Sequence, residues 1–315
     1  MSEKLLEVKH LKKYFDTKAG PLYAVDDISF DINKGETLGV VGESGCGKST
    51  AGRAVLRIHE PTSGEVLFHG ENILNYNKAQ MKALRQKMQI VFQDPYSSLN
   101  PRMSVLELIG DSLKVTGLLD KGTSLEEQVL HTMEIVGLES RLLHAFPHEL
   151  DGGRRQRIGI ARALILDPEF IVMDEPVSAL DVCIQAQILN LMKKLQDEYD
   201  LTYMFISHNL SVVKHVSSSI AVMYLGKIVE IAPAAAIFKE PLHPYTQALL
   251  SSIPIPKVGL ERERIILEGD VPSPIAPPPG CRFAGRCRYA TDKCRESCPE
   301  LKKHGDSMVA CHLYE

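Results

Sequence analysis

Residues 42–50 read Gly42-Glu43-Ser44-Gly45-Cys46-Gly47-Lys48-Ser49-Thr50. This stretch matches the phosphate-binding loop pattern G-x-x-x-x-G-K-[ST], in which glycines let the backbone curl and point several N–H groups at an anion. Residues 36–42 predict a buried strand before the loop, and residues 48–56 predict a helix after it. A phosphate would then lie at the positive end of that helix. In such a loop Lys48 can reach the β- and γ-phosphates of a nucleotide, and the Ser49 hydroxyl can hold Mg²⁺.

An acidic pair follows a second apolar run. Residues 170–173 (Phe-Ile-Val-Met) predict a central strand of a parallel sheet, and Asp174 and Glu175 stand at its carboxyl end. Asp174 would complete the Mg²⁺ shell, directly or through water, and Glu175 is placed to polarise an attacking water. The alternative is a strand followed by a solvated acidic turn, because such a pair alone is weak evidence for a site.

Four further motifs surround this pair. They are Gln93 after the strand-like residues 88–92, Leu150-Asp151-Gly152-Gly153-Arg154-Arg155-Gln156-Arg157, Ser178-Ala179-Leu180-Asp181, and His208 after the apolar residues 203–207. They resemble the Q-loop, signature, D-loop and switch histidine of ABC-type ATPases, in that family's order, over roughly residues 5–255. The resemblance implies an α/β fold of the P-loop ABC ATPase class, with a mostly parallel sheet core, an antiparallel β subdomain and a helical subdomain at about 95–157. It also implies ATP and Mg²⁺ as ligands.

The resemblance assigns roles to single residues. Glu175, His208 and Gln93 are the implied catalytic residues, and Ser49, Gln93 and Asp174 are the implied Mg²⁺ ligands. A ring near the N-terminus is expected to stack on adenine, with Phe15 as the first choice and Tyr14 as the second, although either could be a core residue of the first strand. The remaining implied nucleotide contacts are Gly42, Glu43, Ser44, Gly45, Cys46, Gly47, Lys48, Ser49, Thr50, Asp151, Gly152, Gly153 and Asp181.

Asp151 departs from the family pattern, in which a serine donates its hydroxyl to the γ-phosphate held by the partner subunit. Aspartate is as good a helix N-cap as serine, but an ionised carboxylate accepts and cannot donate. Two outcomes stay open. The carboxylate turns away as a cap, with Arg154 or Arg155 offsetting its charge, and the site works normally. Alternatively, one of two unlike ATP sites turns over slowly.

Three segments narrow the resemblance to the peptide-importer branch, and within it to the "F" type of ATP-binding subunit. They are residues 92–102, residues 243–250 (His-Pro-Tyr-Thr-Gln-Ala-Leu-Leu) and residues 277–281. This branch implies a heterodimer with a homologous second ATPase subunit, two transmembrane permease subunits, and an extracytoplasmic peptide-binding protein that acts indirectly. The alternatives are import of another small solute such as a nickel chelate, a soluble ABC ATPase of DNA repair or translation, and a redox-sensing regulatory module.

Composition agrees with a globular cytosolic subunit. The chain has 315 residues, of which 44% are hydrophobic and 24% charged, and its formal charge is −4. This charge gives no support for a nucleic-acid partner. There is no run of 18 uncharged apolar residues and no apolar signal-peptide region. We therefore expect a peripheral protein at the cytoplasmic face of the inner membrane, held there by its partners.

The composition changes after residues 253–256 (Ile-Pro-Ile-Pro), so we expect an ATPase domain over 1–255 and an extension over 256–315. Residues 272–279 are proline-rich and predicted to be extended. The extension holds five of the seven cysteines: Cys281, Cys287, Cys294, Cys298 and Cys311. Disulfides are disfavoured in a reducing cytosol, so we expect a bound metal ion or cluster to stabilise the fold of this extension. The resemblance implies a [4Fe–4S] cluster on Cys281, Cys287, Cys294 and Cys311, with Cys298 spare. Zinc, the absence of any metal, and ligation by His304 or His312 stay open.

Overall fold

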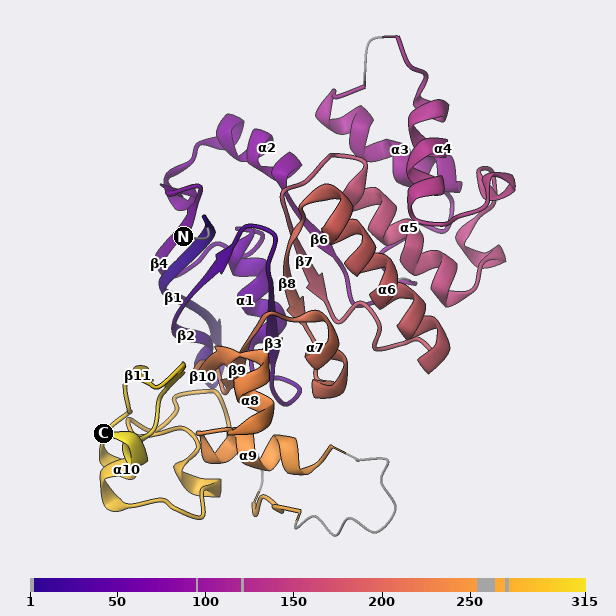
Figure 1. The fold of residues 1–315 in the computed structure, drawn as a ribbon. Helices are drawn as coiled ribbons and strands as arrows, with labels where there is room; N and C mark the ends of the chain where they lie inside the picture. The colour runs from indigo at the N-terminus through magenta and orange to yellow at the C-terminus, as the bar shows by residue number, and fades with distance from the viewer. Residues whose placement is uncertain (1–2, 95, 120–121, 254–263, 270–271) are drawn as a thin grey trace, which may run out of the picture. The chain divides into compact units, whose positions relative to one another are not determined.

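The computed structural model describes residues 3–94, 96–119, 122–253, 264–269 and 272–315 (Figure 1). It divides into two compact units, residues 1–74 with 205–315 and residues 75–204. The phosphate loop belongs to the first unit. So does the cysteine-rich segment, residues 281–315, which holds the five clustered cysteines. The acidic pair and the signature belong to the second.

The first unit begins with an antiparallel sheet of order β2-β1-β4-β5. Its strands are β1 (Lys4–Thr17), β2 (Gly20–Asn33), β4 (Ser63–Phe68) and β5 (Glu71–Asn72). Val8 lies opposite Phe30 on one side and Val66 on the other, so buried apolar side chains meet across three strands. The antiparallel β subdomain that the resemblance implies is confirmed, with a turn at residues 18–19 between β1 and β2.

A second run of strands in this unit supports the phosphate loop, in the order β11-β12-β10-β9-β3. The strands are β3 (Thr37–Val41), β9 (Ser219–Tyr224), β10 (Lys227–Pro233), β11 (Lys302–His304) and β12 (Ser307–Val309). All five residues of β3 are buried, and β3 runs parallel to β9 with Val40 opposite Ala221. This burial explains why residues 37–41 read as an uninterrupted apolar run.

The cysteine-rich segment completes the edge of that sheet. β12 pairs antiparallel with β10, with Val309 opposite Glu230, and β11 and β12 form a hairpin. The extension of the sequence is therefore joined by main-chain hydrogen bonds to the strands behind the phosphate loop, and Figure 1 shows it (yellow) alongside them. Nothing in the local sequence pattern indicated this pairing.

Helices pack on both sets of strands in the first unit. They are α1 (Lys48–Val55), α7 (Leu210–Val216), α8 (Ala234–Lys239), α9 (Pro244–Ser251) and α10 (Asp292–Glu296), with 3-10 turns at Ala284–Arg286 and His312–Tyr314. α1 contacts β1 and β2, α7 contacts β3, and α8 contacts β9 and β10. Within the predicted extended stretch, Ile275 forms a bridge with Leu22 of β2.

The second unit combines parallel strands with a helical layer. β6 (Met88–Val91) and β7 (Phe170–Asp174) run parallel, with Ile90 opposite Val172. Its helices are α2 (Lys78–Lys87), α3 (Val105–Thr116), α4 (Leu125–Ile135), α5 (Gly152–Leu164) and α6 (Val182–Tyr199), with 3-10 turns at Ser140–Leu142 and Pro147–Glu149. The boundary between the units falls inside β8 (Thr202–Ile206), and a 3-10 turn, Ile73–Asn75, spans the other boundary.

Capping residues set the limits of the two helices in the region predicted to be mostly helical. The Ser104 and Ser124 hydroxyls each accept a hydrogen bond from the backbone N–H three residues on. In return, the carboxylates of Glu107 and Glu127 accept from the backbone N–H groups of Ser104 and Ser124. Gly117 ends α3 in the left-handed conformation, φ 78°, which favours glycine. α3, α4 and α5 pack against one another, which places the N-terminus of α5, where the signature lies, at the end of a helical layer.

Candidate active site

The phosphate loop joins the end of β3 to the start of α1, as predicted. Gly47 stands immediately before α1 with φ 102°, and a Cβ at this position would lie 2.0 Å from the Ala24 carbonyl oxygen. Gly42 is equally confined, since its Cβ would lie 2.2 Å from the Met223 carbonyl oxygen. Any larger residue would therefore push the loop away from β2 and β9.

Lys48 closes the loop. Its Nζ donates to the carbonyl oxygens of Gly42 and Glu43, each at 2.9 Å, and the residue is only 4% exposed. Ser49 and Thr50 follow in the first turn of α1, half-buried, while Ser44 and Gly45 are exposed. An ammonium held against an open, glycine-containing loop at a helix start fits a bound triphosphate with its metal ion.

The second unit brings together two of the predicted catalytic residues. Asp174 is fully buried at the end of β7, and Glu175 follows with φ 48°, a left-handed conformation that turns the chain sharply. The Gln93 amide donates to Glu175 Oε2 at 3.2 Å. Gln93 follows β6, so two neighbouring parallel strands deliver these side chains to one edge. A carboxylate held by an amide is oriented to accept a proton from water.

Asp151 acts as a helix cap. Its Oδ1 accepts from the Arg154 backbone N–H at 2.8 Å, and its Oδ2 pairs with Arg154 Nη1 at 3.0 Å. Arg154 also reaches Glu139 at 3.2 Å. Both carboxylate oxygens therefore have partners within the chain, and the predicted Arg154 contact is confirmed. Arg155 turns elsewhere, because its Nε donates to the Pro147 carbonyl oxygen at 2.7 Å.

The D-loop lies next to the signature in the same unit. Asp181 caps α6, accepting from the Ile184 backbone N–H at 3.0 Å. A Cβ on Gly152 would lie 3.1 Å from the Leu180 side chain. A Cβ on Gly153 would lie 2.7 Å from the Ile184 side chain. The two signature glycines thus let α5 begin against the D-loop. His208, in the first unit, is exposed just after β8.

The two candidate adenine-stacking rings differ in their surroundings. Tyr14 packs on Tyr23 at 4.4 Å, and its hydroxyl donates to Asp26 at 2.5 Å, so it is a structural residue of the sheet. Phe15 is half-buried, with its edge toward His59 at 5.6 Å and the Lys13 ammonium 4.8 Å from its centre. The structure therefore favours Phe15 over Tyr14, and its stacking on a base stays a prediction.

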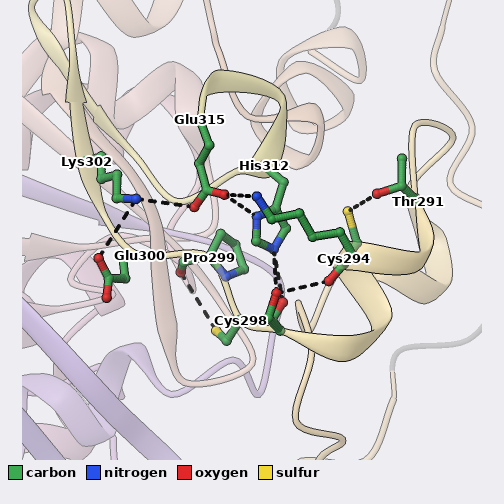
Figure 2. Close-up of polar contacts among 10 residues, drawn as sticks. Thr291, Cys294, Cys298, Pro299, Glu300, Lys302, His312 and Glu315 are labelled. Atoms are coloured by element: carbon green, nitrogen blue, oxygen red, sulfur yellow. Dashed lines mark hydrogen bonds and ion pairs between the residues drawn. The ribbon is translucent and has the colours of Figure 1, made fainter.

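The cysteine-rich segment does not place its side chains as metal ligands. Across the described residues, no group of three or more His, Cys, Asp or Glu is arranged to hold a metal ion. In Figure 2 the Cys294 thiol lies 3.4 Å from the Thr291 hydroxyl, while the Cys298 thiol points to the Pro299 carbonyl at 3.8 Å. The iron–sulfur ligand set on Cys281, Cys287, Cys294 and Cys311 gains no support from this arrangement and stays a prediction. The Cys281 backbone N–H donates to the Cys294 carbonyl oxygen at 2.7 Å.

The two histidines considered as alternative ligands are also engaged. His312 Nδ1 lies 2.7 Å from Glu315, and its Nε2 lies 3.0 Å from the Ser297 carbonyl oxygen (Figure 2). His304 packs against the Tyr314 ring at 4.9 Å. These contacts make both histidines structural residues of the segment.

Two residues at the phosphate loop were not assigned from sequence. The Tyr245 hydroxyl accepts from the Glu43 backbone N–H, and Arg286 pairs with the Glu43 carboxylate, each at 2.9 Å. Tyr245 lies in the segment that resembles the peptide-importer branch, but its contact could not be inferred because the two residues are 202 positions apart.

Comparisons with known proteins show the family to which the chain belongs. Residues 25–178 match the family model described as "ABC transporter", and residues 229–294 match "Oligopeptide/dipeptide transporter, C-terminal region". The putative oligopeptide transport ATP-binding protein YkfD of Bacillus subtilis is 52% identical, over 98% of this chain and 95% of its own length. The chain belongs to the ATP-binding proteins of ABC transporters. Another relative in this family is the dipeptide transport ATP-binding protein DppF of Haemophilus influenzae, 50% identical over 98% of this chain and 96% of its own length.

Solved structures agree with this family. The ATP-binding cassette MJ0796, in a dimeric post-hydrolysis state bound to ADP and Pi, is 27% identical with a TM-score of 0.66, covering 73% of this chain and 98% of that one. As an ABC ATPase, the protein binds ATP with Mg²⁺ and hydrolyses it. In the parts of the chain that the structure describes, no helix is long and apolar enough to cross a membrane.

Proposed function

We propose that this protein is the ATP-hydrolysing subunit that powers import of oligopeptides or dipeptides through a membrane permease. The observation that carries the proposal is the match to peptide-transport relatives over nearly the whole chain, including the C-terminal region at residues 229–294. That region packs as part of the first unit, so it belongs to the folded subunit. We further propose a heterodimer with a second ATPase subunit and attachment to two permease subunits at the cytoplasmic face of the membrane.

The proposed chemistry divides between the motifs. Lys48 and Ser49 bind the phosphates and Mg²⁺, and Asp174 with Gln93 completes the metal shell. Glu175, held by Gln93, polarises the attacking water, and His208 contacts the γ-phosphate. The signature, Asp151 to Gly153, and Asp181 serve the nucleotide of the partner subunit. Phe15 stacks on adenine.

The test is transport in membrane vesicles. Co-expression with the permease and second ATPase subunits should give ATP-dependent uptake of a labelled peptide. An affinity tag on this chain should recover the permease from solubilised membranes. Glu175→Gln is the matched control, because it should keep the complex assembled while stopping uptake. If the wild-type complex assembles intact and takes up no more peptide than the Glu175→Gln complex, the proposal of a peptide substrate is contradicted.

A [4Fe–4S] cluster on Cys281, Cys287, Cys294 and Cys311 stays a prediction that the side-chain arrangement does not support. Protein purified without oxygen decides it by analysis of iron and sulfide. Stoichiometric iron that is lost on substitution of any of the four thiols, and kept in Cys298→Ser, would establish the cluster. Zinc alone would reject it.

A further inference from the structure

Glu43, the second residue of the phosphate loop, has a partner for each of its polar groups. Its carbonyl oxygen accepts from Lys48 Nζ at 2.9 Å, inside the loop. Its backbone N–H donates to the Tyr245 hydroxyl at 2.9 Å, and its carboxylate pairs with Arg286 at 2.9 Å. Two of these three bonds come from outside the loop, from α9 and from the cysteine-rich segment. The position of Glu43, and through its carbonyl that of Lys48, therefore depends on residues more than 200 positions away.

The Arg286–Glu43 pair is sheltered. The Arg286 side chain is 10% exposed and that of Glu43 is 28% exposed. A charge-assisted hydrogen bond in such surroundings is stronger than one between surface side chains, because little water competes for the donor and the acceptor. Burial acts to lower the pKa of Arg286, but the hydrogen bond to Glu43 and its charge raise it overall, which keeps the guanidinium charged.

Aromatic packing fixes the two outside partners. Tyr245 is fully buried, with its ring 4.7 Å from Tyr224 and 5.4 Å from Phe283. Phe283 comes from the cysteine-rich segment, three residues before Arg286, and lies 5.3 Å from Tyr224. One ring cluster thus holds both the hydroxyl and the guanidinium in place, because packed aromatic side chains have few alternative rotamers.

A second arginine ties the same segment to β2. Arg282 pairs with Asp26 and donates to the Leu225 carbonyl oxygen, and its side chain is 6% exposed. Lys227 and the Tyr14 hydroxyl also contact Asp26. Although burial acts to raise it, Tyr14 and the charges of Lys227 and Arg282 hold the pKa of Asp26 below its ordinary value. Arg282 and Phe283 therefore both anchor the stretch of chain from which Arg286 extends to the loop.

We infer that Arg286 and Tyr245 are positioning residues of the nucleotide site, which hold Glu43 so that the phosphate loop is pre-ordered for ATP. The physical basis is that a loop already in its bound conformation does not have to be ordered when the ligand binds. The inference rests on the ATP site of this chain and is independent of the transported substrate. It gives the cysteine-rich segment a role in nucleotide affinity.

ATP affinity of the purified full chain, and steady-state hydrolysis measured with the partner subunit present, test this role. Arg286→Ala should raise the Kd and the KM for ATP about tenfold, the effect expected of one lost charge-assisted bond. The kcat at saturating ATP should stay within about twofold, because Arg286 touches no reacting atom. Arg286→Lys should restore much of the affinity, and Tyr245→Phe should weaken it while keeping the ring cluster. A purely structural role would instead lower kcat and the melting temperature together.

Coupling and a matched control complete the experiment. Glu43→Gln combined with Arg286→Ala should cost no more than the larger single effect, because both remove the same pair. Arg288→Ala is the control, since this arginine belongs to the same segment and lies over Tyr289 at 4.8 Å. Additive single effects, or an equal loss in Arg288→Ala, would overturn the inference. If Arg286→Ala does not fold, unchanged ATP affinity in Tyr245→Phe, which removes the hydroxyl that accepts from the Glu43 backbone N–H, would overturn it. If the ATP affinities of the variants are as expected but the transporter takes up no peptide, the proposed peptide substrate is wrong and the role of Arg286 and Tyr245 is unaffected.

Discussion

Lowering the pH should destabilise this protein through His243. The side chain is 1% exposed at the N-terminus of α9, and its Nδ1 accepts from the Tyr245 backbone N–H at 3.1 Å. Burial lowers the pKa of His243 from 6.5 to about 3. In the unfolded chain His243 is therefore protonated as the pH falls below 6.5, whereas in the folded protein it stays neutral down to about pH 3. The stability that His243 provides is full above pH 6.5 and is lost as the pH falls through this window.

The magnitude follows from the shift. At pH 5.0 the unfolded histidine is 1.5 pH units below its pKa of 6.5, which corresponds to a loss of about 2 kcal/mol in the free energy of unfolding. The neighbouring Glu230 carboxylate accepts from the Leu242 and His243 backbone N–H groups, and burial raises its pKa, so its protonation opposes the loss. A comparison with a variant that keeps Glu230 cancels this contribution.

Urea unfolding between pH 7.5 and pH 5.0 measures the effect. The chain has no tryptophan, so the combined fluorescence of its ten tyrosines reports on unfolding. His243→Asn keeps an acceptor at the helix N-cap but does not titrate. The stability of the wild type should fall about 2 kcal/mol further than that of the variant over this range. His215→Gln, at an exposed position of α7, is the matched control. Equal slopes for wild type and His243→Asn would refute the reasoning.

Three further predictions concern the site and the thiols. Lys48→Ala should abolish ATP binding, while Glu175→Gln should keep binding and stop phosphate release when both are assayed with the partner subunit; normal turnover in Glu175→Gln would reject it as the base. Arg154→Gln should slow turnover of the assembled pair by removing the positive charge that pairs with Asp151 Oδ2, and adding Asp151→Ser should restore it; an unchanged rate in the single variant would contradict this. Burial raises the pKa of Cys281 to about 11. In metal-free protein at pH 8, iodoacetamide should therefore label Cys281 on the order of 100-fold more slowly than in the denatured chain, as measured by peptide mass spectrometry. Equal labelling rates would argue against the burial of this thiol.

Local sequence determined the elements that carry the chemistry. The phosphate loop, the strands β3 and β7, and the capping of α5 by Asp151 all depend on residues close together in the chain. Glycine spacing, an apolar run and an N-cap act within a few residues, so their physical consequences could be read directly. Even the Arg154 contact with Asp151 followed from a spacing of three residues on one helix.

Contacts across large sequence separations were decided only by the tertiary structure. Arg286 reaches Glu43 across 243 positions, and β12 pairs with β10 from the far end of the chain. Such contacts depend on how strands and helices pack, and many partners of similar chemistry compete for each charge or edge. The sequence by itself therefore determined which nucleotide chemistry this protein performs, whereas only the packing of the cysteine-rich segment against β10 and α9 decided what supports its phosphate loop.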